Sequence, residues 1–155
     1  PVMGVVYVPV FKQLYFASIE EGAFLYSDEL KLSEDFTIQS LIQNSDKLPK
    51  NIETKKFTVV GSRSHMSEET EEFIEKLKID HKEIDIISRG SSLKLCMVAE
   101  GLANIYPRFG PTMEWDTAAG HAIVLGAGKK VTLIDNKTNL TYNKENLLNP
   151  WFIVC

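Results

Sequence analysis

The first part of the chain consists of short apolar runs separated by polar turn residues. Residues 4–8, 13–18 and 23–27 are rich in Val, Leu, Phe, Tyr and Ala, a composition that favours β-strands. The Glu-Glu-Gly segment at positions 20–22 lies between the second and third runs and is typical of a turn. Because the runs follow one another closely, the pattern predicts a β-meander over residues 1–27.

The next segment, residues 28–55, is polar and predicts a connector with one short strand over 36–39. From residue 57 onward the pattern changes, because apolar runs of strand length alternate with apolar residues at helical spacing. Such alternation implies parallel strand pairing and an α/β layer. Strands are expected at 57–60, 83–87, 104–106, 131–134 and 152–154, and helices after Ser67, after Ser91 or Ser92, and over 117–126.

Composition narrows the class of protein. The chain has 155 residues, of which 44% are hydrophobic and 25% charged, and its net charge is -4; this describes a globular protein of single-domain size. The absence of a Lys/Arg-rich run argues against binding to a nucleic acid polymer, and no apolar stretch is long enough for a membrane span. Cys96 and Cys155 are interpreted as free thiols in a reducing compartment. The cytoplasm, including the inner face of its membrane, is the expected location.

The chain begins at Pro1, directly inside an apolar run. Natural domains usually begin at a surface, so we expect Pro1 to be a cut edge that has lost preceding sequence. Strands over residues 1–27 would then expose apolar faces and edges. One hypothesis is therefore a non-enzymatic module that forms a homo-oligomer through residues 1–27.

Asp116 is a lone carboxylate at the beginning of a predicted helix of small residues. Asp is a favoured N-cap residue, and Ala118, Ala119 and Ala122 are good helix formers. A carboxylate at this place can also hold a divalent cation, and that cation can hold a phosphate. Two interpretations of Asp116 stay open, an N-cap and a metal ligand, and one carboxylate does not make a metal site.

Three segments near predicted strand ends have the composition of an anion site. Gly61 is followed by Ser, Arg, Ser and His65, Gly90 by two serines, Leu and Lys94, and Arg108 stands between Pro and Phe. Ligands of open α/β sheets bind outside the carboxyl ends of strands, and Arg binds anions with two parallel hydrogen bonds. Each segment also has an ordinary structural interpretation, as a turn, a solvated lysine or a structural arginine.

Several of these motifs together resemble a known family, the CysQ-type 3'(2'),5'-bisphosphate nucleotidases of the inositol monophosphatase-like superfamily. The resemblance covers nearly the whole chain and is loosest over residues 28–55. It implies a five-layer αβαβα sandwich, with residues 1–55 as a remnant of the first sheet plus a connector and residues 56–155 as a C-terminal αβα domain. The motifs that carry it are GVVYVPV (4–10), SRSH (62–65), GSSLKLCMVAEGLANIYPRFGPT (90–112), WDTAAGHAIVLGAG (115–128) and LNPWF (148–152).

The resemblance implies hydrolysis of the 3'-phosphate of adenosine 3',5'-bisphosphate to AMP and phosphate, a by-product recycling step of sulfur assimilation, with two or three Mg²⁺ ions. By position, Asp116 is similar to a late metal ligand of the family. Ser91, Lys94 and Arg108 resemble residues around the nucleotide phosphates, and His65 resembles a substrate-contacting histidine. A second phosphate needs its own cations, which Lys94 and Arg108 can supply, so the nucleotidase is favoured over an inositol or sugar phosphatase.

The sequence departs from the family at one point. The family's other metal ligands are an early Glu and an Asp-Pro-Leu-Asp-Gly-Thr motif, and this chain has no such motif. Mg²⁺ needs several oxygen ligands in near-octahedral array, so Asp116 alone should hold it poorly. We therefore expect the intact protein to be an enzyme and this chain by itself to be inactive or nearly so.

Overall fold

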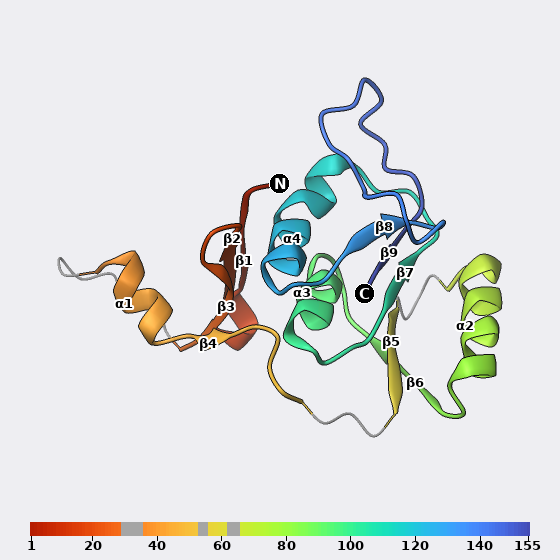
Figure 1. The fold of residues 1–155 in the computed structure, drawn as a ribbon, viewed down its shortest axis with the longest axis horizontal. Helices are drawn as coiled ribbons and strands as arrows, with labels where there is room; N and C mark the ends of the chain where they lie inside the picture. The colour runs from red at the N-terminus through yellow and green to blue at the C-terminus, as the bar shows by residue number, and fades with distance from the viewer. Residues whose placement is uncertain (29–35, 53–55, 62–65) are drawn as a thin grey trace.

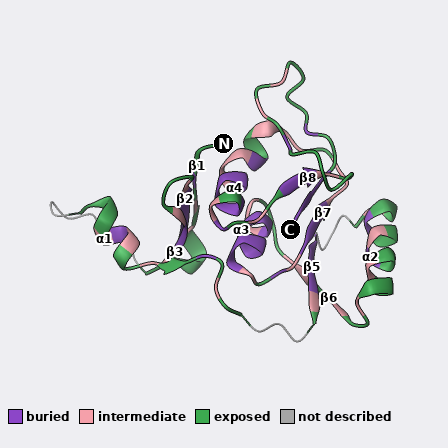
Figure 2. Cartoon of the chain, viewed as in Figure 1, coloured by how far each residue is buried: buried purple, intermediate pink, exposed green. Residues whose placement is uncertain are grey.

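The computed structural model describes residues 1–28, 36–52, 56–61 and 66–155 (Figure 1). Its elements form successive layers: helix α1 at one end, the sheet of β1 to β4, the helices α3 and α4 in the middle, a second group of strands, and helix α2 at the other end. This layered α/β arrangement agrees with the predicted fold class. The core lies mainly around α3 and α4 (Figure 2).

The N-terminal sheet is antiparallel and has the strand order β1-β2-β3-β4, so the predicted meander is confirmed. A short fourth strand from the connector extends it along β3. The last strand pairs only over Phe24 to Lys47 and Leu25 to Asp46. The strands are β1 (Met3–Val8), β2 (Gln13–Ser18), β3 (Gly22–Ser27) and β4 (Asp46–Lys47).

The connector contains helix α1 (Ile38–Gln43), and the predicted strand over 36–39 is wrong. The reason is local. The Thr37 hydroxyl accepts a hydrogen bond from the Ser40 amide at 3.1 Å, and the Ser40 hydroxyl accepts one from the Thr37 amide at 3.2 Å. This reciprocal capping box satisfies the first amides of a helix and so favours a helix start at this point.

Helix α4 (Glu114–Gly126) packs closely on the inner face of the N-terminal sheet. A side chain at Gly4 of β1 would lie 2.3 Å from the Ala119 carbonyl oxygen, so only glycine permits this contact. The neighbouring helix α3 (Leu93–Glu100) is almost wholly buried. Residues of β2, β3, α3 and α4 share one apolar cluster, and the proposed division of the chain at residue 55 stays a prediction.

The second group of strands is partly parallel and partly antiparallel. Strands β5 (Phe57–Gly61) and β6 (Ile84–Ser88) are parallel, as predicted. In the other sheet β9 (Phe152–Val154) runs antiparallel to both β7 (Tyr106–Arg108) and β8 (Val131–Leu133). The general prediction of parallel pairing is therefore wrong for this sheet, because β9 follows a long irregular segment rather than a crossover helix.

Helix α2 (Glu68–Asp80) lies on the outer side of β5 and β7 (Figure 1). Ser67 is its N-cap, as predicted, and its hydroxyl accepts a hydrogen bond from the Thr70 amide at 3.4 Å. Both cysteines are free thiols, and Cys96 is buried in the main core. No helix of the described residues is both long and apolar enough to span a membrane.

Candidate functional site

A pocket of about 330 Å³ lies between the start of α3, strand β7 and the start of α4. It brings together four of the five predicted site residues, Ser91, Lys94, Arg108 and Asp116, which come from three separate parts of the chain. The fifth, His65, lies outside the described residues. The pocket is also lined by Ser92, Leu95, Tyr106, Pro111, Thr112, Trp115, Thr117 and Phe152.

Lys94 forms part of a cationic wall of this pocket. Its side chain is only 6% exposed, and its Nζ donates a hydrogen bond to the Arg89 carbonyl oxygen at 3.2 Å and lies 5.4 Å from the ring centroid of Tyr106. Burial, followed by the nearby charge of Arg108, lowers the pKa of Lys94. Neither cation has a carboxylate partner in the described part of the chain. An anion in the pocket would offset both the burial of the Lys94 charge and its repulsion by Arg108.

The guanidinium of Arg108 completes this wall. Its Nη2 donates a hydrogen bond to the Pro111 carbonyl oxygen at 3.0 Å, which orients the group. Its Nε is buried and has no hydrogen-bond partner among the described residues. A buried donor without a partner is costly. The burial and charge of Arg108 therefore suit an anion-binding role.

The loop before α3 adds hydroxyl groups to the cationic wall. Ser91 has a positive φ of 50°, and Ser92 occupies the N-cap position of α3, in agreement with a helix start at Ser91 or Ser92. The Ser92 side chain makes no capping hydrogen bond. Hydroxyls and amides at the start of a helix favour negative charge, so this edge of the pocket complements Lys94 and Arg108.

Asp116 lies on the opposite wall and is not the N-cap of α4. Met113 occupies the N-cap position with extended backbone, and Asp116 is the third helical residue. The Asp116 Oδ2 accepts a hydrogen bond from the Met113 amide at 2.8 Å. The N-cap interpretation of Asp116 is therefore wrong, and the helix predicted over 117–126 begins at Glu114. The helix starts earlier because a later loop supports its first turn: the Glu114 amide donates to the Leu147 carbonyl oxygen at 3.0 Å.

Asp116 is exposed at the pocket, and its Oδ1 makes no hydrogen bond within the described residues. This oxygen could contact a divalent cation. However, no group of three or more Asp, Glu, His or Cys residues able to hold a metal ion occurs among the described residues. The described residues therefore do not by themselves fit a Mg²⁺ site, which needs a near-octahedral array of oxygens. Asp116 offers one ligand of such a site.

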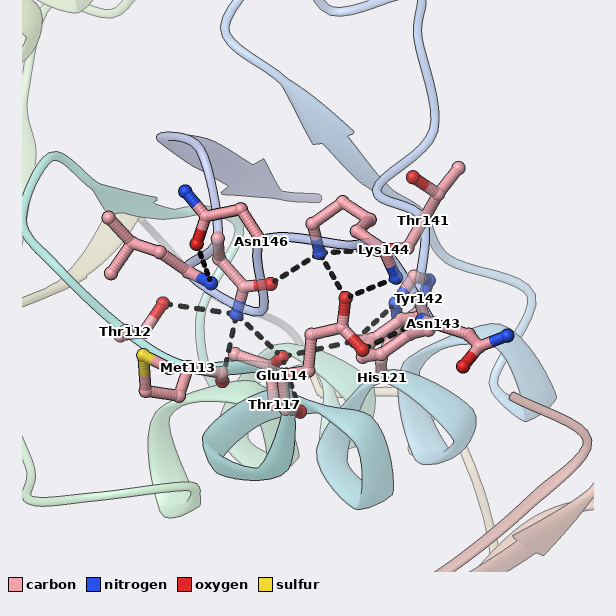
Figure 3. Close-up of polar contacts among 12 residues, drawn as sticks. Thr112, Met113, Glu114, Thr117, His121, Thr141, Tyr142, Asn143, Lys144 and Asn146 are labelled. Atoms are coloured by element: carbon pink, nitrogen blue, oxygen red, sulfur yellow. Dashed lines mark hydrogen bonds and ion pairs between the residues drawn. The ribbon is translucent and has the colours of Figure 1, made fainter.

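The neighbouring carboxylate of Glu114 is fully engaged by the protein (Figure 3). It accepts hydrogen bonds from the backbone amides of Asn143 at 2.7 Å and Lys144 at 3.2 Å, and it forms an ion pair with the Lys144 ammonium. The hydrogen bond from Lys144 is the largest cause of a lowered pKa of Glu114. Glu114 therefore fixes the loop over residues 141–149 to the start of α4 rather than serving a ligand.

A polar network continues from this loop into α4 (Figure 3). The Tyr142 hydroxyl lies 2.9 Å from Nδ1 of His121 and donates to the Thr117 hydroxyl at 3.1 Å. His121 is only 3% exposed, as expected for a packed helix residue. Burial is the main cause that lowers its pKa to about 4. The residues of this loop received no role from the sequence, although Asn149 belongs to the LNPWF motif.

A second cavity of about 550 Å³ adjoins the first. Both cavities are lined by Tyr106, Arg108 and Pro111, so Arg108 stands between them. Gly61 and Met66, which flank the undescribed segment containing His65, line the second cavity. The arrangement offers room for a ligand with two anionic groups on either side of one guanidinium.

Known proteins provide an independent comparison. CysQ of Salmonella typhimurium, a 3'(2'),5'-bisphosphate nucleotidase, is 44% identical over 154 residues, which are 99% of this chain and 54% of the relative. CysQ of Escherichia coli strain K12 is 41% identical with the same coverage. The chain therefore spans about half the length of the curated relatives it matches.

Solved structures agree with the sequence comparison. The crystal structure of CysQ from Bacteroides thetaiotaomicron, a bacterial member of the inositol monophosphatase family, is 52% identical and superposes with a TM-score of 0.94 over 99% of this chain and 57% of that chain. A staphylococcal inositol monophosphatase II with bound 2'AMP shares the fold at 20% identity and a TM-score of 0.66, over 99% of this chain and 51% of that chain. The sequence model of the inositol monophosphatase family matches residues 1–151, and the chain belongs to this family.

Proposed function

We propose that this chain is part of a phosphomonoester hydrolase that removes the 3'-phosphate of adenosine 3',5'-bisphosphate to give AMP and phosphate. The observation that carries the proposal is the pair of cations, Lys94 and Arg108, which lie without a carboxylate partner in the described residues at a pocket opposite Asp116. An enzyme that transfers phosphoryl groups works mainly by positioning and by charge stabilisation. Such cations serve that purpose.

The choice of a bisphosphate rests on the number and placement of the cations. Arg108 lines two adjoining cavities, and Lys94 lines one of them. A nucleotide with two phosphates can contact both cations, whereas an inositol monophosphate offers one phosphate. The matched relatives from Salmonella and Escherichia are named 3'(2'),5'-bisphosphate nucleotidases, which supports the same choice.

We also propose that catalysis depends on a divalent metal ion, Mg²⁺, with Asp116 as one ligand. The exposed Oδ1 of Asp116 supports this role, and the position matches the metal-ligand aspartate implied by the family resemblance. The described residues offer no complete ligand set. We therefore infer that residues 1–155 alone bind the nucleotide weakly, through Ser91, Lys94 and Arg108, and do not turn it over.

A phosphate-release assay tests the proposal. The protein encoded by the complete open reading frame is given adenosine 3',5'-bisphosphate or inositol 1-phosphate, with Mg²⁺ or with a chelator. We expect rapid phosphate release from the nucleotide in the presence of Mg²⁺ only. Equal or faster release from inositol 1-phosphate would overturn the substrate assignment in favour of an inositol or sugar phosphatase. Turnover by residues 1–155 alone at the rate of the complete protein would overturn the inferred inactivity.

A second candidate role, self-association through the N-terminal sheet, is favoured by a separate observation. The apolar side chains of Met3, Val5, Val10 and Phe11 are exposed, and β1 is an edge strand of the sheet formed by the described residues. Exposed apolar edges favour pairing with another chain. Light scattering of residues 1–155 tests this role: a dimer that becomes monomeric after Val5→Lys supports it, and a monomer at all concentrations contradicts it.

A further inference from the structure

Asn149 of the LNPWF motif makes a set of contacts that the proposed chemistry leaves without a role. Its side chain is only 4% exposed. Its backbone amide donates to the Thr112 carbonyl oxygen at 2.8 Å. Its Nδ2 lies 2.9 Å from the Met113 carbonyl oxygen and 3.1 Å from the Thr117 hydroxyl, and 3.3 Å from the Thr112 hydroxyl. One side chain thus contacts both the segment before α4 and its first turn.

The chemistry of its neighbours fixes the orientation of this carboxamide. The Met113 carbonyl oxygen can only accept a hydrogen bond, so the amide nitrogen must face it. The opposite neighbour, the Lys144 ammonium, can only donate, and it lies 3.5 Å from Oδ1 of Asn149. A carboxylate of the same shape would place an oxygen against the Met113 carbonyl. Both a donor and an acceptor are therefore needed at position 149.

Met113 connects Asn149 to the carboxylate of the pocket. Its carbonyl oxygen accepts hydrogen bonds from Nδ2 of Asn149 at 2.9 Å and from the Asp116 amide at 3.0 Å. Its own amide donates to Oδ2 of Asp116 at 2.8 Å. Asn149 thus holds the residue that holds one oxygen of Asp116, and the other oxygen is left for a ligand.

We infer that Asn149 is a positioning residue, which fixes the backbone of Met113 and thereby aims the free oxygen of Asp116 into the pocket. The inference rests on the proposed role of Asp116 in the phosphatase. Residues that orient a metal ligand from behind affect metal affinity strongly even though they touch no metal. The loop over residues 141–149 therefore supports the pocket indirectly, by holding the start of α4, which carries Asp116.

The first experiment measures the backbone directly in residues 1–155. We compare amide hydrogen exchange of the parent with Asn149→Ala and with Asn149→Ser, which keeps one donor. Asn146→Ala is the matched control, because Asn146 lies in the same loop and, among the residues that the structure describes, its Oδ1 accepts only the Leu148 amide. We expect exchange over residues 113–117 to rise about tenfold in the alanine variant, less in the serine variant, and not in the control. Unchanged exchange over 113–117 would overturn the inference.

The second experiment separates positioning from general stability in the protein of the complete open reading frame. Affinity for Mn²⁺, measured from the electron paramagnetic resonance signal of the free ion without substrate, should fall about tenfold in Asn149→Ala. The metal concentration for half-maximal activity should rise by a similar factor, while the KM for adenosine 3',5'-bisphosphate changes less than about twofold. Asn149→Ser should restore part of the metal affinity, and Asn146→Ala should match the parent.

These experiments distinguish a failure of the inference about Asn149 from a failure of the proposed function. A fall in kcat with unchanged metal affinity would mean that Asn149 has only a structural role, and would overturn the inference. A parent protein that releases no phosphate from the nucleotide would instead overturn the proposed function, and hydrogen exchange and Mn²⁺ affinity would still decide the role of Asn149.

Discussion

The two walls of the pocket differ in how their charges are satisfied. On the wall formed by α3 and β7, Lys94 is buried, Arg108 is partly buried, and neither has a carboxylate partner in the described residues. On the wall formed by α4, the Asp116 carboxylate accepts a hydrogen bond from the protein itself, and the neighbouring Glu114 carboxylate, outside the pocket lining, anchors the loop over residues 141–149. The cationic wall is thus incomplete without an anion, whereas the carboxylate wall is organised in advance.

Because of this difference, the two walls contribute differently to folding stability and to ligand binding. Burying a cation without a partner reduces stability, so the cationic wall favours ligand binding at the expense of the folded state. The hydrogen bonds of the loop over residues 141–149 stabilise the carboxylate wall before any ligand arrives. Substitutions on the two walls should therefore have different effects on stability and on binding.

The largest expected effect comes from Asp116. Asp116→Asn removes the negative charge but keeps an oxygen that can accept the Met113 amide. We expect phosphate release by the protein of the complete open reading frame to fall about 10³-fold, because the proposed role of Asp116 is to hold the divalent cation that stabilises the reacting phosphate. The free energy of unfolding should change by less than about 0.5 kcal/mol.

A matched control for this prediction is Glu145→Gln, which neutralises an exposed carboxylate of the neighbouring loop. It should leave phosphate release unchanged. Near-parent activity of Asp116→Asn would contradict the role of the carboxylate wall.

The next effect concerns the pH dependence of stability that arises from His121, which is buried in α4. The pKa of His121 is lowered to about 4 in the folded protein, whereas an unfolded histidine titrates near its usual value of about 6.5. Between these values the unfolded chain binds more protons than the folded one, so stability falls as the pH is lowered from 6.5 to 4. We expect His121 to account for a loss of about 3 kcal/mol over this range.

Urea unfolding at several pH values measures this loss. His121→Gln should remove most of the pH dependence, while His81→Gln, which changes a partly exposed histidine, should keep it. Identical pH profiles for the parent and His121→Gln would contradict the assignment.

A smaller effect is expected for the cationic wall, where one substitution should raise stability and lower nucleotide affinity. Lys94→Met keeps an apolar stem and removes the buried charge. Affinity of residues 1–155 for adenosine 3',5'-bisphosphate, measured by calorimetry, should fall about tenfold, and stability in urea should rise by about 1 kcal/mol.

Lys130→Met, which removes an exposed lysine away from the pocket, is the control and should change neither quantity. A loss of stability in Lys94→Met together with unchanged affinity would contradict the difference between the walls.

The smallest effect concerns the Glu114 anchor. Glu114→Gln removes the charge that pairs with Lys144 and weakens two hydrogen bonds to backbone amides. We expect a small loss of stability in urea unfolding, because the amides of Asn143 and Lys144 keep only a weaker acceptor, with nucleotide affinity unchanged. Glu83→Gln, at an exposed ion pair with Lys56, should cost less than about 0.5 kcal/mol. Equal losses in the two variants would show that the anchor contributes no more than a surface pair.

Much of the architecture could be predicted from local patterns. The meander, the Ser67 cap and the position of β9 follow from apolar runs and capping residues that act within a few positions. The meeting of Ser91, Lys94, Arg108 and Asp116 in one pocket agrees with the grouping that the family resemblance implied.

The wrong predictions have identifiable causes. The helix start at Asp116 depended on a loop about thirty residues later in the chain, whose Leu147 carbonyl oxygen accepts the Glu114 amide. No local pattern contains that information. The strand predicted over 36–39 is wrong for the opposite reason, because a local capping box of Thr37 and Ser40 starts a helix there. The role of Asn149 was invisible because its contacts join segments distant in sequence.

The central claim is that the pocket between α3, β7 and α4 binds a phosphorylated nucleotide. An amide NMR titration of residues 1–155 with adenosine 3',5'-bisphosphate tests it most directly. We predict that the largest shift changes occur at Ser91, Ser92, Arg108 and Asp116 and are strongly reduced in Lys94→Met. No shift changes up to about 10 mM nucleotide, or changes centred elsewhere in the molecule, would contradict the claim.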